Sequence, residues 1–233
     1  MTGIALTAAA VVMTVLGTYY FLRKKTDKKR ALLCKVLATS VPGVLLVGFL
    51  LLGNGGSHQD AGAVSFGWAA GWTLAAVLCY MAADILLECR FVAGAVCFGA
   101  GHICMSAGFL AGSISGADGC TMLWAAAMAV LFVGCAFVMF CRYFPHLRKK
   151  RLLGPAVLYI VILSVMAALA VAAGLCSGGM KGLIPAAGGV SFVISDILLG
   201  LNRLGKKRSI PRGAAVLILY YLSVYLFAMW VWI

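Results

Sequence analysis

Long apolar segments separated by short polar ones dominate the pattern of this sequence. Segments of about 20 mostly apolar residues, the length that crosses a bilayer as a helix, recur eight times along the chain. Lipid offers no water to pair with backbone polar groups, so such segments adopt helices that pair these groups internally. The pattern therefore predicts transmembrane helices over Gly3–Leu22, Ala31–Leu52, Val64–Leu87, Phe91–Gly112, Thr121–Cys141, Pro155–Cys176, Leu183–Leu201 and Gly213–Trp232.

Composition agrees with a membrane protein. Of the 233 residues, 64% are hydrophobic and 11% are charged, whereas roughly a quarter are charged in an average soluble protein. The mean hydropathy is +1.07. These values exclude an ordinary soluble globule, a disordered chain and a disulfide scaffold. No segment between the apolar ones is long enough for a soluble domain, so we expect residues 1–233 to form one all-α integral membrane domain, an eight-helix bundle.

Positive charge gathers in alternate connectors between these segments. The first, fifth and seventh connectors each carry a net charge of +5, the third is neutral, and the even connectors together carry −1. Because basic residues concentrate in cytoplasmic loops, we expect the odd connectors to be cytoplasmic and both termini to lie on the non-cytoplasmic side. The net charge of +13 then reflects topology and contact with anionic lipids rather than nucleic-acid binding. This bias suits a bacterial inner membrane.

The nine cysteines show neither a CxxC pair nor a Cys/His spacing typical of zinc, so we expect no metal and no cofactor. Most of them lie singly within apolar segments, where cysteine behaves as a small apolar residue. Cys120 and Cys176 both fall on the external side of the predicted topology. That compartment allows a disulfide between them without requiring one.

Three residues of fixed charge remain inside the apolar segments, namely Lys35, Asp84 and Asp196. A charge at the centre of a spanning helix costs at least about 2.5–3.5 kcal/mol, so each needs a reason to be there. From the helical rise of about 1.5 Å per residue, we expect them to share the cytoplasmic part of the bundle, with His102 deeper. All have alternative structural roles, as ion pairs, as a lysine that snorkels to the headgroups, or as helix–helix contacts.

The two aspartates occur in similar pentapeptides, Ala83-Asp84-Ile85-Leu86-Leu87 and Ser195-Asp196-Ile197-Leu198-Leu199. The pentapeptides are four predicted helices apart, and an arginine follows each one, at Arg90 and Arg203. A duplicated four-helix unit would give this arrangement.

Five short motifs follow one another along most of the chain. They are Cys34-Lys35-Val36-Leu37-Ala38-Thr39, the first pentapeptide, Gly101-His102, the second pentapeptide with Asn202-Arg203 beyond it, and Tyr220-Tyr221. In this order they resemble the motifs of the YhhN family, multi-pass membrane proteins that include lysoplasmalogenases. The departures are Val36 in place of Pro, Ala83 in place of Gly, Met105 in place of Tyr, and a missing Gln after the tyrosine pair. They leave both aspartates intact.

The resemblance implies a membrane-embedded hydrolase that cleaves the vinyl ether bond of a lysoplasmalogen, a lysophospholipid, to a fatty aldehyde and a glycerophospho-base. Protonation of the outer alkene carbon and addition of water call for a proton donor and a carboxylate, as in glycosidases. We expect Asp196 to be the general acid and Asp84, near Lys35 or Arg90, to be its ionised partner. The reverse assignment stays open, as do the head group, the chain preference and the oligomeric state.

Supporting roles are expected for the remaining polar residues of the motifs. His102 would orient water or a carboxylate, and Ser195 stands beside one of the acids. The residues expected to hold the polar part of the substrate are Asn202, Tyr220 and Tyr221. The lipid chain would lie between helices, and the basic cytoplasmic rim would bind the phosphate.

Other membrane proteins also use buried acids. An intramembrane aspartyl protease carries Tyr-Asp and Gly-x-Gly-Asp motifs, whereas Ala83 and Ser195 precede the two acids here. A zinc-dependent amidase needs several histidines in its spans, and only His102 qualifies. A proton-coupled transporter or a lipid-binding protein that uses the same acid pair remains an alternative.

Overall fold

A computed structural model describes residues 2–53, 61–114, 118–149, 153–204 and 209–232. The described residues form helices and contain no strand. The helices are α1 (Thr2–Arg23), α2 (Lys28–Gly53), α3 (Ala61–Cys89), α4 (Phe91–Phe109), which continues as the π-helical turn η1 (Leu110–Ile114), α5 (Gly119–Lys149), α6 (Leu153–Ser177), α7 (Gly179–Leu204) and α8 (Ile210–Trp232). Each predicted span falls within one of these elements, or within α4 together with η1, which confirms the predicted helices.

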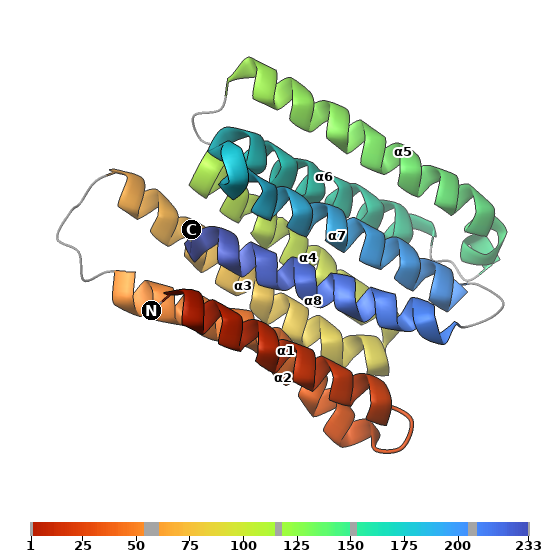
Figure 1. Ribbon diagram of the computed structural model, residues 1–233. Coiled ribbons are helices and arrows are strands. Elements are labelled where there is room, and N and C mark those ends of the chain that lie inside the picture. Colours follow the sequence, from red (N-terminus) through yellow and green to blue (C-terminus); the bar gives the residue numbers. More distant parts are fainter. Residues whose placement is uncertain (1, 54–60, 115–117, 150–152, 205–208, 233) are drawn as a thin grey trace.

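Seven of these helices contain apolar stretches of 21 to 25 residues, long enough to cross a membrane. In α5 the described apolar stretch, Thr121–Cys135, is shorter. The fifth crossing therefore stays a prediction, although α5 itself is a continuous helix of 31 residues. The helix α1 begins and α8 ends at the same end of the bundle (Figure 1).

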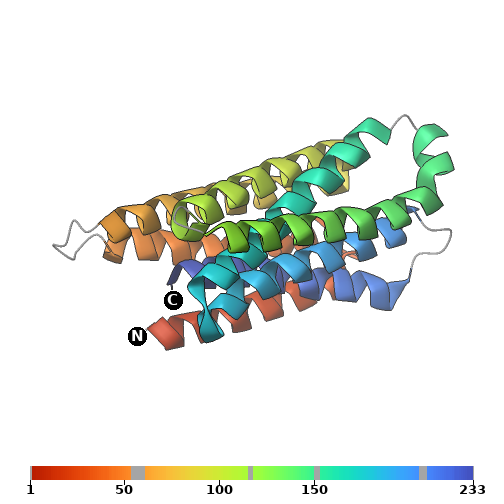
Figure 2. The same cartoon turned by 90° about the horizontal axis from the view of Figure 1, so that it is seen from above.

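Sequence neighbours pack side by side as antiparallel pairs, α1 with α2, α3 with α4, and α7 with α8. The helix α8 also contacts α1, α2 and α3, whereas α5 lies at one edge and, within the described part of the chain, contacts only α6 and α7. Figure 2 shows α6 inclined to its neighbours. The short turn between α6 and α7 uses Gly178 and Gly179, whose φ angles of 64° and 52° fall in the left-handed region that favours glycine.

Polar and apolar side chains are distributed as in a membrane protein. Large apolar side chains project outward, with exposed fractions of 80% at Ile4 and 75% at Leu51. The interior holds aromatic and aliphatic side chains together with several polar ones, namely Lys35, Thr39, Thr73, Asp84, His102, Ser164, Ser195 and Ser223. Lipid can cover the outer apolar surface, whereas the buried polar groups need partners inside the protein. These buried polar groups and their partners are therefore candidates for a functional site.

The first prediction concerns the contact between α3 and α4. A Cβ on Gly94 would lie 2.6 Å from the backbone nitrogen and 2.8 Å from the Cα of Leu87. Backbone atoms cannot rotate away as a side chain can, so we expect Gly94→Ala to destabilise the protein by about 1–3 kcal/mol. Gly71→Ala is the matched control, because a Cβ there meets nothing within 4 Å. Thermal unfolding in detergent measures both, and equal midpoints would contradict the tight contact.

Candidate functional site

Asp84 lies on α3 with an exposed fraction of 1% and is surrounded by hydrogen-bond donors. The Lys35 ammonium on α2 lies 3.0 Å from Oδ1. Oδ2 accepts hydrogen bonds from the Thr39 hydroxyl at 2.6 Å and from the Tyr220 hydroxyl on α8 at 3.1 Å. Lys35 and Thr39 are one helical turn apart, so they share the face of α2 that meets Asp84. This Asp84 cluster, made of Asp84, Lys35, Thr39 and Tyr220, joins three helices and compensates the buried charge.

Asp196 on α7 belongs to a different chain of hydrogen bonds. The Tyr159 hydroxyl on α6 donates to Asp196 Oδ2. Behind it, His102 Nε2 on α4 lies 3.3 Å from the Tyr159 oxygen, and the Tyr80 hydroxyl on α3 lies 3.0 Å from His102 Nδ1. We call Tyr80, His102, Tyr159 and Asp196 the Asp196 chain.

The donors in the Asp196 chain can be assigned from one end to the other. Because Tyr159 donates its proton to Asp196, its oxygen accepts from His102, which places the imidazole proton on Nε2. His102 Nδ1 then accepts from Tyr80. Every hydrogen bond therefore points toward the Asp196 carboxylate. Four helices hold this group in one orientation.

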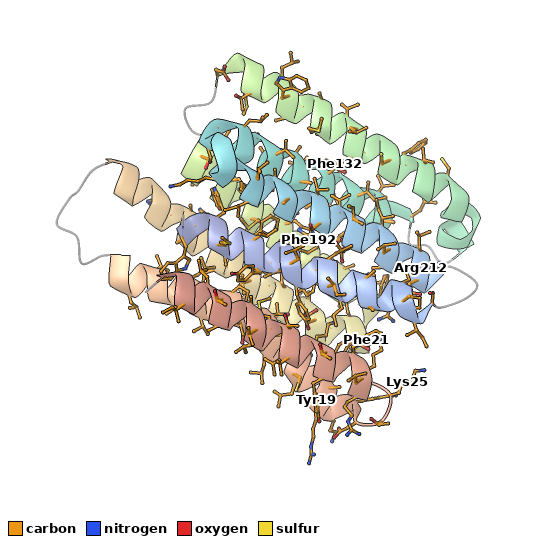
Figure 3. The ribbon with its side chains drawn as sticks, in the orientation of Figure 1. Tyr19, Phe21, Lys25, Phe132, Phe192 and Arg212 are labelled. Atoms are coloured by element: carbon orange, nitrogen blue, oxygen red, sulfur yellow. The ribbon has the colours of Figure 1, made fainter. Side chains whose placement is uncertain are left out.

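Aromatic rings separate the two aspartates. The ring of Phe192 on α7 lies 4.6 Å from His102 and 5.7 Å from Tyr220, measured between centroids. The ring of Phe98 on α4 lies 5.6 Å from both Tyr80 and Tyr220. Phe192 lies in the middle of the bundle (Figure 3). In the described structure no side-chain hydrogen bond joins the Asp84 cluster to the Asp196 chain. The two groups meet through these aromatic contacts and through α3, which carries both Asp84 and Tyr80.

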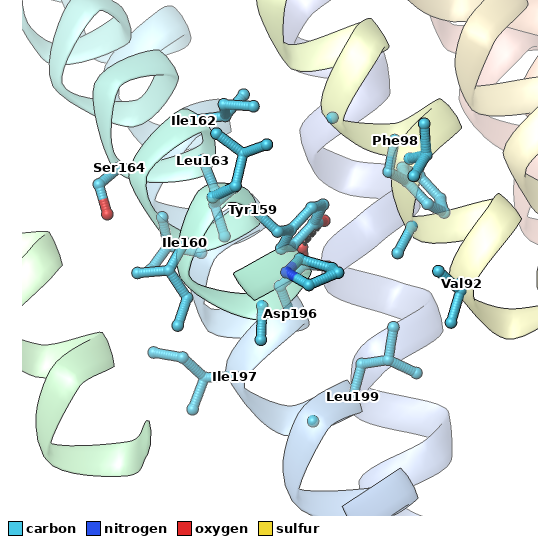
Figure 4. Close-up of a pocket in the computed structure, with 18 of the residues that line it drawn as sticks. Val92, Phe98, Tyr159, Ile160, Ile162, Leu163, Ser164, Asp196, Ile197 and Leu199 are labelled. Atoms are coloured by element: carbon cyan, nitrogen blue, oxygen red, sulfur yellow. Dashed lines mark hydrogen bonds between the residues drawn. The ribbon is translucent and has the colours of Figure 1, made fainter. Parts of the chain in front are cut away.

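Asp196 also faces a groove with a volume of about 630 Å³. The groove lies mainly between α4, α6 and α7, and Phe132 of α5 contributes to its edge. Its lining is almost entirely apolar, with Tyr159, Ser164 and Asp196 as the residues with polar side chains. In Figure 4, Tyr159 and Asp196 lie together in the middle of the groove, and the side chains around them include Val92, Phe98, Ile160 and Ile197. Asp84 is not among the lining residues.

Three other residues singled out from the sequence support the backbone of the bundle. The Ser195 hydroxyl donates to the Val216 carbonyl at 2.9 Å, and the Tyr221 hydroxyl donates to the Lys35 carbonyl at 3.4 Å. Asn202 Oδ1 accepts from the Ser209 amide at 2.9 Å. The structure therefore brings Lys35 and Tyr220 to Asp84 and joins His102 to Asp196 through Tyr159. It places Ser195 and Asn202 outside both hydrogen-bond networks, and Tyr221 contacts the Asp84 cluster through the backbone carbonyl of Lys35.

Sequence reasoning missed Thr39, Tyr80 and Tyr159. Thr39 lies one helical turn from Lys35, and Tyr80 lies one helical turn from Asp84, so helical periodicity alone could have indicated both. Tyr159 is the lone aromatic residue of α6, and that is the signal that could have found it. Its contact with Asp196 depends on the packing of α6 against α7.

The described residues also bear on a metal site and on the disulfide suggested from the sequence. Within the described residues, no group of three or more His, Cys, Asp and Glu side chains lies close enough to hold a metal ion. Cys176 carries a free thiol. The side chain of Cys120, its suggested partner, lies outside the described residues.

The second prediction tests the Asp84 cluster by a double-mutant cycle. Lys35→Met leaves a buried carboxylate unpaired, which is expected to cost about 3–5 kcal/mol of the free energy of unfolding. Asp84→Asn leaves the ammonium unpaired in the same way. The double variant Lys35→Met/Asp84→Asn leaves no unpaired charge, so it should lose much less than the sum of the two single variants. Losses that simply add in detergent unfolding measurements would show that the pair does not interact.

Comparison with known proteins identifies the family. The family model described as YhhN family matches residues 35–231, nearly the whole chain. The search of curated proteins and the search of solved structures returned no match. The matched segment contains both hydrogen-bond networks and every residue that lines the groove. This chain belongs to the YhhN family.

Proposed function

We propose that this protein hydrolyses the vinyl ether bond of a lysoplasmalogen, releasing a fatty aldehyde and a glycerophospho-base. One observation carries the proposal, namely that Asp196 supplies a carboxyl group to the wall of a groove that is almost entirely apolar. A lipid chain fits such a groove, and a carboxylic acid beside the vinyl ether can protonate its double bond. Membership of the YhhN family is consistent with a membrane hydrolase of the lysoplasmalogenase type.

The reaction can be written with Asp196 as proton donor and acceptor in turn. Protonated Asp196 transfers its proton to the outer alkene carbon, and the electron pair of the double bond forms the new C–H bond. The resulting oxocarbenium ion lies beside the Asp196 carboxylate, which stabilises its charge. Water then adds to the cation and gives a proton to the same carboxylate. The bond from the hemiacetal carbon to the glycerol oxygen then breaks, and the hydroxyl proton of the hemiacetal passes to that oxygen, which leaves the aldehyde and the alcohol. A glycosidase acid switches to a base in a similar way.

The other residues of the Asp196 chain hold the Asp196 carboxyl group in one orientation. Tyr159 donates to one carboxylate oxygen and is itself held by His102. That arrangement keeps the second oxygen available to the groove. We assign His102, Tyr159 and Tyr80 as positioning residues, because preorganised hydrogen bonds hold a catalytic group in the reactive geometry.

The proposal gives Asp84 a structural role, in place of the ionised catalytic partner expected from the sequence. Its carboxylate accepts from Lys35, Thr39 and Tyr220. It also lies outside the groove lining, and its partner Tyr220 packs against Phe98 and Phe192. A carboxylate with its charge compensated in this way contributes little to stabilising a cation elsewhere.

The membrane setting is part of the proposal. The odd connectors would be cytoplasmic, both termini would be external, α5 would complete the eighth crossing, and anionic lipids would contact the basic rim. Most basic residues of the fifth and seventh connectors lie outside the residues whose side chains are described. A bacterial inner membrane as the location of this protein is part of the same proposal.

The third prediction separates the two aspartates. We expect Asp196→Asn to lower aldehyde release from a vinyl ether lysophospholipid by about 10²-fold or more, the typical effect of losing a general acid. The double variant Lys35→Met/Asp84→Asn should retain most of the activity of the wild type. Activity is measured on purified protein in detergent that has passed a thermal unfolding check.

Three results would contradict this proposal. Near wild-type turnover by Asp196→Asn would remove the assigned acid, and loss of turnover in the well-folded double variant would restore Asp84 as the ionised partner. Substrate-dependent proton flux in liposomes without aldehyde release would favour the transporter alternative.

The fourth prediction tests whether the substrate binds along the groove beside Asp196. Gly200 lines the groove, and a Cβ there meets nothing within 4 Å. Gly200→Leu should therefore fold normally while filling space beside Asp196, and we expect KM to rise by about tenfold. Gly71→Leu, at an equally open position on α3, should leave KM unchanged. Equal KM values for the two variants would place the substrate elsewhere.

A further inference from the structure

Positive side chains gather at the end of the bundle where α7 ends and α8 begins. Arg203 lies on the last turn of α7, with Nη2 3.8 Å from Glu88 Oε1. The Arg212 guanidinium donates to the Leu201 carbonyl at 3.4 Å. The Lys24 ammonium lies 4.3 Å from the ring centroid of Phe21. Phe21 and Arg212 lie at this same end (Figure 3). We call Lys24, Arg203 and Arg212 the cationic cluster.

Among the described residues, Glu88 is the carboxylate that contacts the cationic cluster. Glu88 contacts Arg203 and also accepts a hydrogen bond from the Tyr20 hydroxyl at 3.1 Å. Burial lowers the pKa of Lys24, and the charges of Lys25, Lys35 and Arg203 lower it further, against the opposing effect of Glu88. Three cations beside the Glu88 carboxylate leave the cationic cluster with an excess of positive charge that an anion would relieve.

Arg203 connects the cationic cluster to the groove. Its guanidinium carbon lies 5.8 Å from the ring centroid of Phe91, and Phe91 and Leu201 both line the groove. The side chain of Arg203 is 31% exposed, so a ligand can reach it. Arg203 thus stands at the mouth of the groove that contains Asp196.

The spacing along α7 relates Arg203 to the proposed acid. Asp196 and Arg203 are seven residues apart, which is close to two full turns, so both lie on one side of the helix. The rise between them is about 10 Å. Gly200 lies between them on the groove side and has no side chain, and a Cβ there would meet nothing within 4 Å. The surface between Asp196 and Arg203 is therefore open.

We propose that Arg203 binds the phosphate of a single-chain glycerophospholipid at the mouth of the groove and so sets which bond of the lipid reaches Asp196. A guanidinium binds phosphate with two parallel hydrogen bonds, which fixes orientation as well as position. Glu88 holds the guanidinium in place. The glycerol then spans the open surface at Gly200, and the hydrocarbon chain enters the groove. This inference rests on the proposed function for the role of Asp196.

The fifth prediction is tested first by binding, which requires no catalysis. The probes are a 1-O-alkyl lysophosphatidylcholine, which has no vinyl ether to cleave, and the corresponding 1-O-alkylglycerol, which has no phosphate. Calorimetry in detergent should show that Arg203→Gln weakens binding of the phospholipid by about tenfold or more and leaves binding of the alkylglycerol unchanged. Arg203→Lys should restore part of the affinity, because it keeps the charge but loses the second hydrogen bond.

Arg30→Gln is the matched control. Arg30 is also a cation paired with an acid, since its Nε lies 3.4 Å from Asp27 Oδ2. It lies near the start of α2 and does not line the groove. The Arg30→Gln variant loses the same charge as Arg203→Gln, and its affinity for both probes should equal that of the wild type. An equal loss of affinity in Arg30→Gln would reduce the effect of Arg203 to general electrostatic attraction and overturn the proposal.

Competition identifies the source of the phosphate. A two-chain phosphatidylglycerol and inorganic phosphate should each displace the alkyl lysophospholipid poorly, because the groove accepts one chain and an ion has none. Displacement by the two-chain lipid at equal concentration would assign Arg203 to bilayer lipid instead and overturn the proposal. A loss of alkylglycerol affinity in Arg203→Gln would also overturn it, because it would show a structural role.

Failure of this inference can be told from failure of the proposed function. Phosphate-dependent binding through Arg203 without any aldehyde release from a vinyl ether lysophospholipid would refute the hydrolase and leave the phosphate site standing. Aldehyde release with the same KM in Arg203→Gln and wild type would refute the phosphate site and leave the hydrolase standing.

Discussion

A polar group inside a membrane domain must find its partner within the protein, because lipid supplies none. In this chain the rule acts on very few side chains, and these few hold the bundle together. Asp84 takes an ammonium and two hydroxyls from α2 and α8, so neutralising one carboxylate also fixes the relation of three helices. Two tyrosines of α8 also join helices, since Tyr221 donates to a backbone carbonyl of α2 and Tyr225 donates to one of α1.

The same rule explains why the two aspartates differ. Asp84 has donors on all sides and no opening, whereas Asp196 accepts from Tyr159 and otherwise faces a groove lined by apolar side chains. A carboxyl held on one side and open on the other can exchange a proton with a molecule that enters the groove. The similar pentapeptides around the two acids therefore lead to different environments, because α3 lies beside the lysine of α2 and α7 lies beside the tyrosine of α6.

The helix α7 links the parts of the site along one side. Asp196, Gly200 and Arg203 follow one another at intervals of about one turn, from the apolar middle of the bundle to its charged end. This order matches that of the proposed lysophospholipid substrate, from its vinyl ether to its phosphate. Under the proposed function, a single rigid helix sets the distance between the reacting bond and the charged head, which loops could not fix as closely.

The sequence by itself determined the helices, because long apolar segments in lipid have no alternative to helical hydrogen bonding. It also indicated Lys35, Asp84, His102 and Asp196, since polar residues in such segments carry a cost that only a specific role offsets. It could not determine which polar residues meet. Tertiary structure alone decided that Thr39 and Tyr220 surround Asp84, that Tyr159 reaches Asp196, and that Phe98 and Phe192 separate the acids. These contacts join residues up to 136 positions apart, and they follow from the packing of helix faces, which periodicity along one helix does not specify.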